Sequence, residues 1–120
     1  MSVPVEIPAL ADATVQYGAA AYFLTTSDDG RPHISHVTVG WVGDDLRVAV
    51  GRSGLRNISA RPAAALLWSP VVPGGYSLIV DVVARVDDDH ALLSPERAVL
   101  HRPAPGLDGA APGGHDCAPI

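Results

Sequence analysis

The chain has 120 residues and a formal net charge of −5, which fits one domain and leaves no room for a second core. The negative charge argues against nucleic acid or an anionic membrane surface as the partner. All eight basic residues are arginines, and the absence of lysine excludes a Schiff-base lysine and a P-loop. Arginine binds oxyanions through two hydrogen bonds, so recognition of a phosphate stays open.

The cysteine count and the hydropathy pattern argue against disulfides, zinc sites and membrane spans. The only cysteine, Cys117, has no partner in the chain, so neither an internal disulfide nor a thiolate zinc site is expected. The start of the chain lacks a basic region followed by an apolar run, and no stretch reaches the ~18 apolar residues of a membrane span. We therefore expect a cytoplasmic protein without a membrane partner.

The first part of the chain is predicted to hold a helix and two strands. Residues 1–6 have the pattern of a loose arm, and the segment from Ile7 to Gly18 favours a helix that buries one apolar face. Alternation then predicts strands over 21–26 and 33–42, joined by a turn at 27–30. The residues expected on the buried face of the helix are Ile7, Leu10, Ala11 and Val15.

The stretch from Leu46 to Pro62, LRVAVGRSGLRNISARP, is predicted to begin as a third strand and to end as a short helix, with Ser53 as the N-cap. The first N–H groups of such a helix have no partner within it. Together with two glycines and with Arg52 and Arg56, they form a candidate phosphate site. Turns of this composition are also common as purely structural connections, which is the alternative.

The second half is predicted to complete a small, closed or nearly closed antiparallel barrel. A strand over 63–69 is apolar on both faces, as expected when both faces are buried, and a long strand covers 76–87. Pro95 interrupts the next segment, which favours either a helical turn at 94–96 or a final strand over 98–101. The domain is expected to span residues 1–102. A Pro/Gly-rich tail over 103–120 would be disordered or would cross to a partner subunit.

The sequence resembles the pyridoxamine 5'-phosphate oxidase-like, flavin-binding split-barrel superfamily over roughly Leu10 to Pro103. The likeness lies in AYFLTTSDDGRPHISHVTVGWVGDDLRVAV, GRSGLRNISARPAAALLW and GYSLIVDVVARVDDD. These contain a Gly-Arg-Pro-His turn, a small-residue phosphate loop and an Arg-Asn-Ile-x-x-x-Pro helix end. The closing SPERAVLHRPAP is similar to short actinobacterial members.

This resemblance implies a mainly β, six-stranded antiparallel split barrel with one N-terminal helix and one short helix between strands. It implies a homodimer with cofactor sites in the clefts between subunits, and FMN or the deazaflavin coenzyme F-420 as the hydride carrier. Many members have a phosphate-binding lysine where this chain has Gly54, and most catalytic members are longer at the C-terminus. The residues implied along the ring are His36, Val37 and Thr38, and those implied around the phosphate are Gly51, Arg52, Ser53, Arg56 and Asn57.

Other kinds of site receive little support from the sequence. His33 and His36 lie three apart on a predicted strand and so point to opposite faces, which argues against a metal site. Gly51–Leu55 only partly matches the G-x-S-x-G nucleophile elbow, so Ser53 is not expected to be a nucleophile. His36 fits a barrel position as well as a ring contact. The residues expected to pack in the barrel or the dimer are Trp41, Trp68 and Tyr76.

These features predict a flavin- or deazaflavin-dependent oxidoreductase that transfers hydride to or from a small molecule. No residue is assigned a catalytic role, because the cofactor would carry most of the chemistry. The alternative is a non-catalytic split-barrel protein that carries or sequesters a flavin-like or tetrapyrrole ligand, or that has lost its cofactor. Gly54 and the short C-terminal region favour this alternative.

Overall fold

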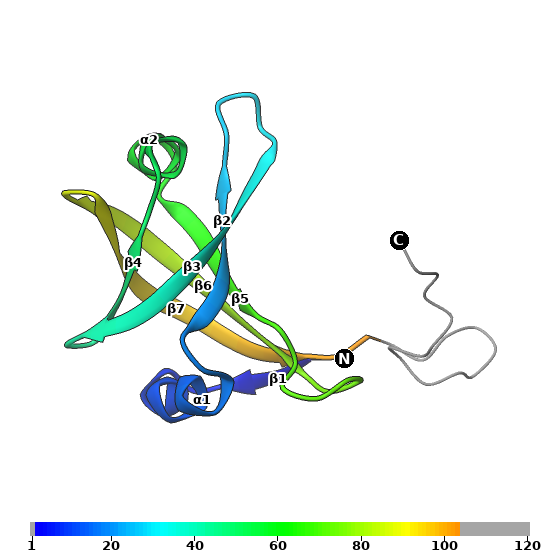
Figure 1. Ribbon diagram of the computed structural model, residues 1–120. Helices are drawn as coiled ribbons and strands as arrows, with labels where there is room; N and C mark the ends of the chain where they lie inside the picture. Colours follow the sequence, from blue (N-terminus) through cyan, green and yellow to red (C-terminus); the bar gives the residue numbers. More distant parts are fainter. Residues whose placement is uncertain (1, 104–120) are drawn as a thin grey trace.

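A computed structural model describes residues 2–103, which form an antiparallel barrel with a helix across each end (Figure 1). Six strands close the barrel in the order β7-β4-β3-β2-β5-β6, and β6 pairs back onto β7. This confirms the predicted mainly β, six-stranded barrel with two helices. In chain order the elements are β1 (Ser2–Val5), the 3-10 helix η1 (Ile7–Ala9), α1 (Leu10–Tyr17), β2 (Ala20–Thr26), β3 (Pro32–Val42), β4 (Asp45–Ala49), α2 (Arg52–Ala60), β5 (Ala63–Trp68), β6 (Ser77–Asp87) and β7 (His90–His101).

The N-terminal segment is a strand, so the prediction of a loose arm was wrong. Ser2–Val5 pairs antiparallel with the last residues of β7, outside the closed barrel. The pairing joins residues almost a whole domain apart, which local pattern cannot reveal. Pro4 has no N–H to donate to a neighbouring strand, and it is tolerated because β1 is the edge strand of the sheet.

The segment around Pro95 is one continuous strand, and the possible helical turn at 94–96 does not form. The pairing of β6 with β7 shifts between Asp81↔Arg97 and Val82↔Pro95, so Glu96 is an extra residue without an opposite partner. Such a bulge accommodates a proline and bends its strand. The predicted final strand over 98–101 is therefore only the end of β7. The predictions for residues beyond Pro103 lie outside the described part of the chain.

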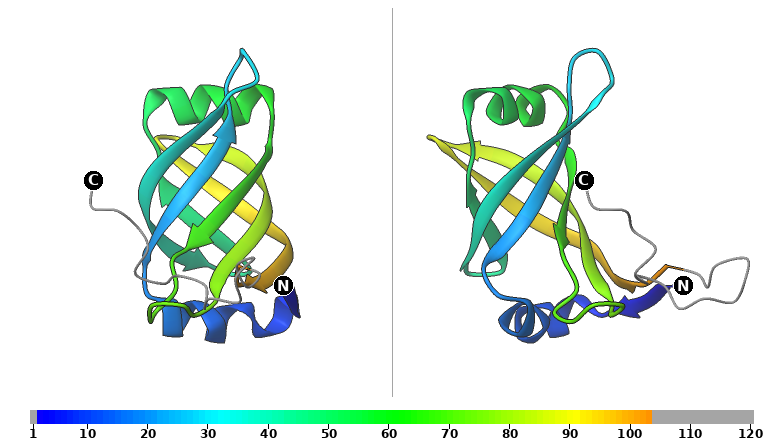
Figure 2. Two further views of the ribbon diagram at one scale, coloured as in Figure 1. Left: turned by 90° about the vertical axis from the view of Figure 1, so that its right-hand side faces the viewer. Right: turned by 45° about the vertical axis from the view of Figure 1, so that its right-hand side comes forward.

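Alternate residues of the barrel strands fill the interior, where Phe23, Leu66 and Trp68 are at most 1% exposed. α1 covers one end of the barrel and α2 the other, as both views in Figure 2 show. Side-chain hydrogen bonds tie each helix region to the barrel. The Trp68 indole donates to the Gly18 carbonyl after α1 (2.9 Å), and the Asn57 side-chain amide in α2 donates to Thr25 Oγ1 (3.0 Å).

Of the residues that were predicted to lie on the buried face of α1, only Leu10 is buried, so the rest of this prediction was wrong. Thr14 is buried instead, whereas Val15 is 81% exposed. Leu10, Ala13 and Tyr17 pack on the barrel core from the same side as Thr14. There the Trp41 indole donates to Thr14 Oγ1 at 3.1 Å, and Thr14 donates in turn to the Ala11 carbonyl. Each residue of a helix turns by about 100°, so burying position 14 turns position 15 away from the core.

The outer surface of β2, β3, β5 and β6 carries an exposed apolar face. Ile34 is 60% exposed, Tyr22 39% and Val83 38%. β5 was expected to be buried on both faces, but only Leu66 and Trp68 are buried, whereas Ala63 is exposed and Ala65 and Leu67 are partly exposed. Within residues 2–103, no helix is both long and apolar enough to cross a bilayer.

Candidate cofactor site

The candidate site begins where β3 and β4 separate. β3 pairs with β2 from Pro32 to Thr38, but it pairs with β4 only from Val39 to Val42. Beyond the last pair the chain leaves β3, and the Val50 N–H donates to the Asp89 carbonyl at 3.2 Å. Among the described strands, the first half of β3 therefore has no partner on its β4 side. Alternate backbone N–H and C=O groups along that edge are left without a strand partner.

The start of α2 follows directly after the end of β4, at the point where β4 leaves β3. If the β3–β4 register continued past Val39↔Val48, Ala49 would lie opposite Thr38 and Gly51 opposite His36. The Leu55 N–H makes the first intrahelical bond, to the Gly51 carbonyl at 3.0 Å. The N–H groups that precede it in the helix have no partner within the helix. These positive ends of peptide dipoles favour an anion.

Ser53 is not the N-cap that the sequence predicted. Gly51 occupies that position with extended backbone angles (φ −72°, ψ 172°), and no side chain caps the helix. Ser53 is the second residue of α2 and is exposed. A serine inside the first turn cannot cap its own helix, so the amide groups there remain available to a ligand.

The three predicted ring residues do not share one face. His36 and Thr38 lie on the outer side of β3, whereas the Val37 side chain points into the barrel and is 8% exposed. The His36 ring stacks on Tyr22 of β2, with ring centroids 5.0 Å apart and an interplanar angle of 27°. Val37 can therefore contact a ligand in the opening only through its backbone.

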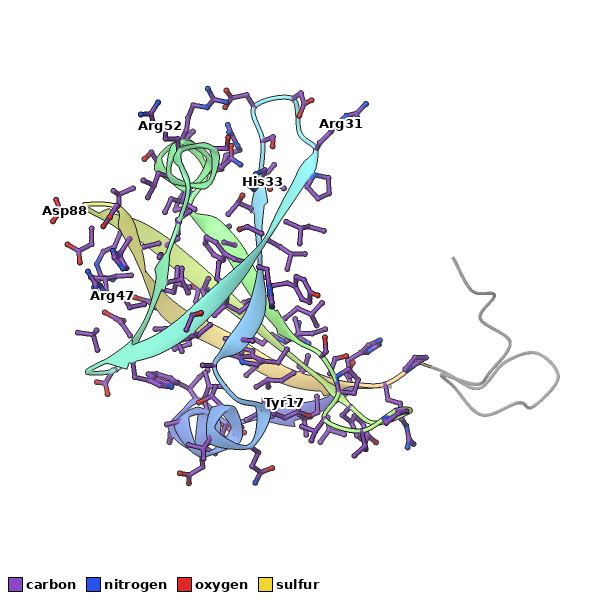
Figure 3. The ribbon with its side chains drawn as sticks, viewed as in Figure 1. Tyr17, Arg31, His33, Arg47, Arg52 and Asp88 are labelled. Atoms are coloured by element: carbon purple, nitrogen blue, oxygen red, sulfur yellow. The ribbon has the colours of Figure 1, made fainter. Side chains whose placement is uncertain are left out.

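The predicted phosphate residues divide into an exposed group and a buried one. Arg52 lies at the start of α2, far from Arg31 at the tip of the β2–β3 hairpin (Figure 3). Arg56 Nε is 3.9 Å from Asp28 Oδ2, while Arg61 Nη2 approaches Asp28 Oδ1 to 2.6 Å. The hydrogen bond from Arg61 lowers the pKa of Asp28, so this carboxylate is held mainly by Arg61. Asn57 is 2% exposed and bonds to Thr25, which makes it a positioning residue for α2.

The two glycines of the loop differ in their surroundings. A Cβ at Gly51 would meet no atom within 4 Å, so the space beside this residue is open. A Cβ at Gly54 would collide with Val50 Cγ1. Gly54 is therefore a packing glycine, and any larger side chain at this position would displace Val50.

Replacing Gly54 with alanine should destabilise the protein by about 1–2 kcal/mol, because overpacking costs roughly 1–3 kcal/mol and the better helix propensity of alanine returns up to about 1. In a Val50→Ala background the obstructing methyl is gone, so the same change should be neutral or slightly stabilising. Urea denaturation of the four proteins of this double-mutant cycle measures the difference. An equal cost in both backgrounds would show that Val50 is not the obstacle.

Sequence reasoning missed Arg47 and His90, which line a hollow of about 380 Å³ together with Thr38 and Ala49 at the point of separation. Arg47 lies directly opposite Gly40 in the β3–β4 register, and its Nε is 3.6 Å from Asp87 Oδ2. The tight turn between β3 and β4 fixes that register, so the position of Arg47 could have been found. His90 comes from β7, and no local signal pairs β7 with β4.

The structure also bears on the possible metal site and on the two tryptophans. Within residues 2–103, no three His, Cys, Asp or Glu side chains gather in a group that could hold a metal ion. Trp68 is buried and Trp41 is partly buried beside α1, which confirms the expectation that both pack in the barrel.

Comparison with known proteins extends these observations. No family model matches the sequence. An uncharacterized protein of Mycobacterium bovis and one of Mycobacterium tuberculosis are each 39% identical to the chain over 132 residues, covering 94% of this chain and 92% of the relative. Identity at this level over nearly the full length places the chain in the same family as these two proteins.

Solved structures share the fold at low sequence identity. A Clostridium acetobutylicum protein of the pyridoxinephosphate oxidase family matches with a TM-score of 0.63 and 10% identity, over 82% of this chain and 91% of that one. The FAD binding protein from Mycobacterium smegmatis matches with a TM-score of 0.60 and 20% identity, over 85% and 100%. An F-420 reductase matches with a TM-score of 0.53 and 19% identity, over 78% and 93%. The chain therefore has the same barrel fold as these three proteins, and it belongs to the family of the two mycobacterial proteins.

Proposed function

We propose that the protein binds a flavin-type cofactor, FMN or coenzyme F-420, in the opening between β3 and the start of α2, and that it transfers hydride to or from a small molecule. The observation that carries this proposal is the uncapped start of α2 beside an unpaired strand edge. Helix amides suit a phosphate, and a strand edge suits the polar rim of a flavin ring. The FAD binding protein and the F-420 reductase that share this fold support a cofactor of this type.

The residues around the start of α2 fit a phosphate group. The open space beside Gly51 lets the anion approach the backbone, and the N–H groups of Arg52, Ser53 and Gly54 point toward the helix start. No ion pair engages Arg52 within residues 2–103, so its guanidinium is available for the charge that lysine supplies in many superfamily members. Arg56 is a weaker second contact, because it also faces Asp28.

The ring of the cofactor would lie along β3. The backbone of His36, Val37 and Thr38 lies on the half of the strand that has no β4 partner, and it supplies hydrogen-bonding groups for the ring edge. The side chains of His36 and Thr38 lie on the outer side of the strand, where they can contact the ring. The cofactor supplies the hydride chemistry when bound, and these residues orient it.

We further propose that the apolar outer face binds a second copy of the chain. Ile34, Tyr22 and Val83 are exposed there, and removing such area from water contributes about 25 cal/mol per Å². His36 and Tyr22 join this face to the opening, so a second subunit would also shield the ring from water. Hydride transfer gains from this exclusion, because water can intercept reactive intermediates.

Titration of the purified protein with FMN and with coenzyme F-420 tests the proposal, with riboflavin as the control that lacks the phosphate. One of the two cofactors should bind, and riboflavin should bind much more weakly. Arg52→Ala should lower the cofactor affinity by about tenfold or more, since a charge-assisted hydrogen bond contributes roughly 1.5–3 kcal/mol. Arg31→Ala, which removes an exposed charge paired with Asp29 on the β2–β3 hairpin, should leave the affinity within about twofold.

The outcomes separate the proposed enzyme from its non-catalytic alternative. No binding of either cofactor at high micromolar concentration would contradict the proposal, as would equal affinities of the Arg52→Ala and Arg31→Ala proteins. A different result would support a carrier. In that case the cofactor binds in a phosphate-dependent way, but neither reduced nicotinamide nucleotides nor small-molecule acceptors change its redox state. Absorbance of the bound flavin or deazaflavin reports on its redox state directly.

A further inference from the structure

A second candidate site lies at the other end of the barrel, between α1 and the β3–β4 turn. A groove of about 790 Å³ opens there, and Ile7, Ala11, Val15, Trp41, Asp44 and Pro95 are among its lining residues. It is separate from the opening beside α2, since α1 and α2 cover opposite ends of the barrel (Figure 2). The groove therefore needs an explanation of its own.

The apolar side of this groove is a helix stripe that the core does not use. Ile7, Ala11 and Val15 follow each other at intervals of four residues and are all exposed, with Val15 81% exposed. The same helix packs its other side against the barrel, with Leu10 and Thr14 buried there. An aligned apolar row that stays exposed after the helix has packed on its own barrel is a surface for another partner.

The other side of the groove is acidic. Asp45 is already engaged, because Arg85 Nη2 lies 2.6 Å from its Oδ2 and Ser94 donates to its Oδ1. Asp44 is exposed and has no ion pair within residues 2–103, and no arginine of that range lines the groove. Glu6 and Asp12 are exposed on the segment that carries the apolar stripe. The surface therefore combines an apolar floor with uncompensated negative charge.

We propose that this groove binds a short amphipathic segment of another protein, with apolar side chains against Ile7, Ala11, Val15 and Trp41 and with lysine or arginine beside Asp44. Charge complementarity selects this occupant. The tail over 104–120 carries Asp108 and Asp116 without lysine or arginine, so it would add like charge. A second copy placed groove to groove would bring the two Asp44 carboxylates and their acidic neighbours together.

The test uses the full-length protein and a labelled 14-residue amphipathic peptide of leucine and lysine as the probe, with a leucine–glutamate peptide as the charge control. The leucine–lysine peptide should bind and should protect Trp41 from quenching by acrylamide. Trp68 is 1% exposed, so the quenchable fluorescence comes from Trp41. The glutamate peptide should bind at least about tenfold more weakly, because it meets the same acidic surface with like charge.

Two pairs of variants locate the binding. Val15→Asp should weaken binding of the lysine peptide by about tenfold or more, because it puts a carboxylate in the apolar contact, and its exposed position should leave folding intact. Val86→Asp, at an exposed valine of β6 near the far end of the barrel, is the matched control. Asp44→Asn should weaken binding by about threefold. Asp88→Asn should not, since Asp88 lies far from α1 (Figure 3) and asparagine tolerates its φ of 56°.

Several results would overturn the proposal. Equal binding of the lysine peptide to the wild-type and Val15→Asp proteins would do so, as would equal binding of the two peptides. A fall in the oligomeric mass of the protein alone on Val15→Asp substitution would assign the groove to a second copy. Increased acrylamide quenching of Trp41 in a full-length Leu107→Asp variant without peptide would assign it to the tail of the chain.

Discussion

Replacing Trp68 with alanine should lower the free energy of unfolding by about 3–5 kcal/mol, because the change removes the largest fully buried side chain and leaves a cavity. Domains of this kind are stable by only about 5–15 kcal/mol, so the variant would lose a large share of its stability. The indole also donates to the Gly18 carbonyl at 2.9 Å, which ties the end of α1 to the barrel. Denaturation by guanidinium, followed by circular dichroism, measures the loss.

Trp68→Phe separates the two contributions of this side chain. Phenylalanine keeps most of the apolar volume but cannot donate to the Gly18 carbonyl. Trp68→Phe should therefore lower the free energy of unfolding by less than Trp68→Ala does, by about 1–3 kcal/mol, for the carbonyl left without its partner and for the lost volume. A cost below about 1 kcal/mol for Trp68→Ala would contradict this account, because it would mean that burial of the Trp68 side chain contributes little to stability.

Substituting Ile34 with aspartate should dissociate the proposed dimer and abolish cofactor binding together. Ile34 is 60% exposed on the apolar outer face, so the single subunit should tolerate the change. In the dimer the carboxylate would be buried against apolar side chains, which costs several kcal/mol when no partner is present. Sedimentation velocity reports the dissociation, and the FMN and F-420 titrations report the loss of the site.

Val42→Asp is the matched control for this experiment. Val42 lies on the same strand and on the same side of it as Ile34, and it is 54% exposed, but it is at the far end of β3 beside the turn. This variant should stay dimeric. Dissociation by both variants would indicate general destabilisation, and a dimer that survives Ile34→Asp would place the contact elsewhere.

The sequence predicts the barrel well because its strands carry their own signal. The alternation in β3 also shows that Val37 must point away from His36 and Thr38, which the structure bears out. The face of α1 was predicted wrongly because the chain offers two apolar rows, and the row of Leu10, Ala13 and Tyr17 packs on the core, where Trp41 also donates to Thr14. Ser53 favours an N-cap by residue type, yet the helix begins at Arg52, two residues earlier than this predicts, and Gly51 is the N-cap.

The candidate site, too, could be predicted from the sequence only in part. The glycine- and arginine-containing loop is visible in the sequence, whereas its counterpart, the unpaired edge of β3, follows only from where β4 leaves the sheet. Asn57 has the side chain of a ligand-binding residue, but its burial under α2 gives it a structural partner in Thr25. Tertiary position decides between these roles, because the same amide can donate to a ligand or to the barrel.

The most direct test is to map cofactor binding on the ¹⁵N-labelled protein by amide chemical shifts. On saturation with FMN or coenzyme F-420, we expect the largest shifts at Arg52, Ser53 and Gly54 and along β3 from His36 to Thr38. Shifts centred on α1 and Trp41, or no shifts at all, would contradict a flavin-type cofactor held between β3 and the start of α2.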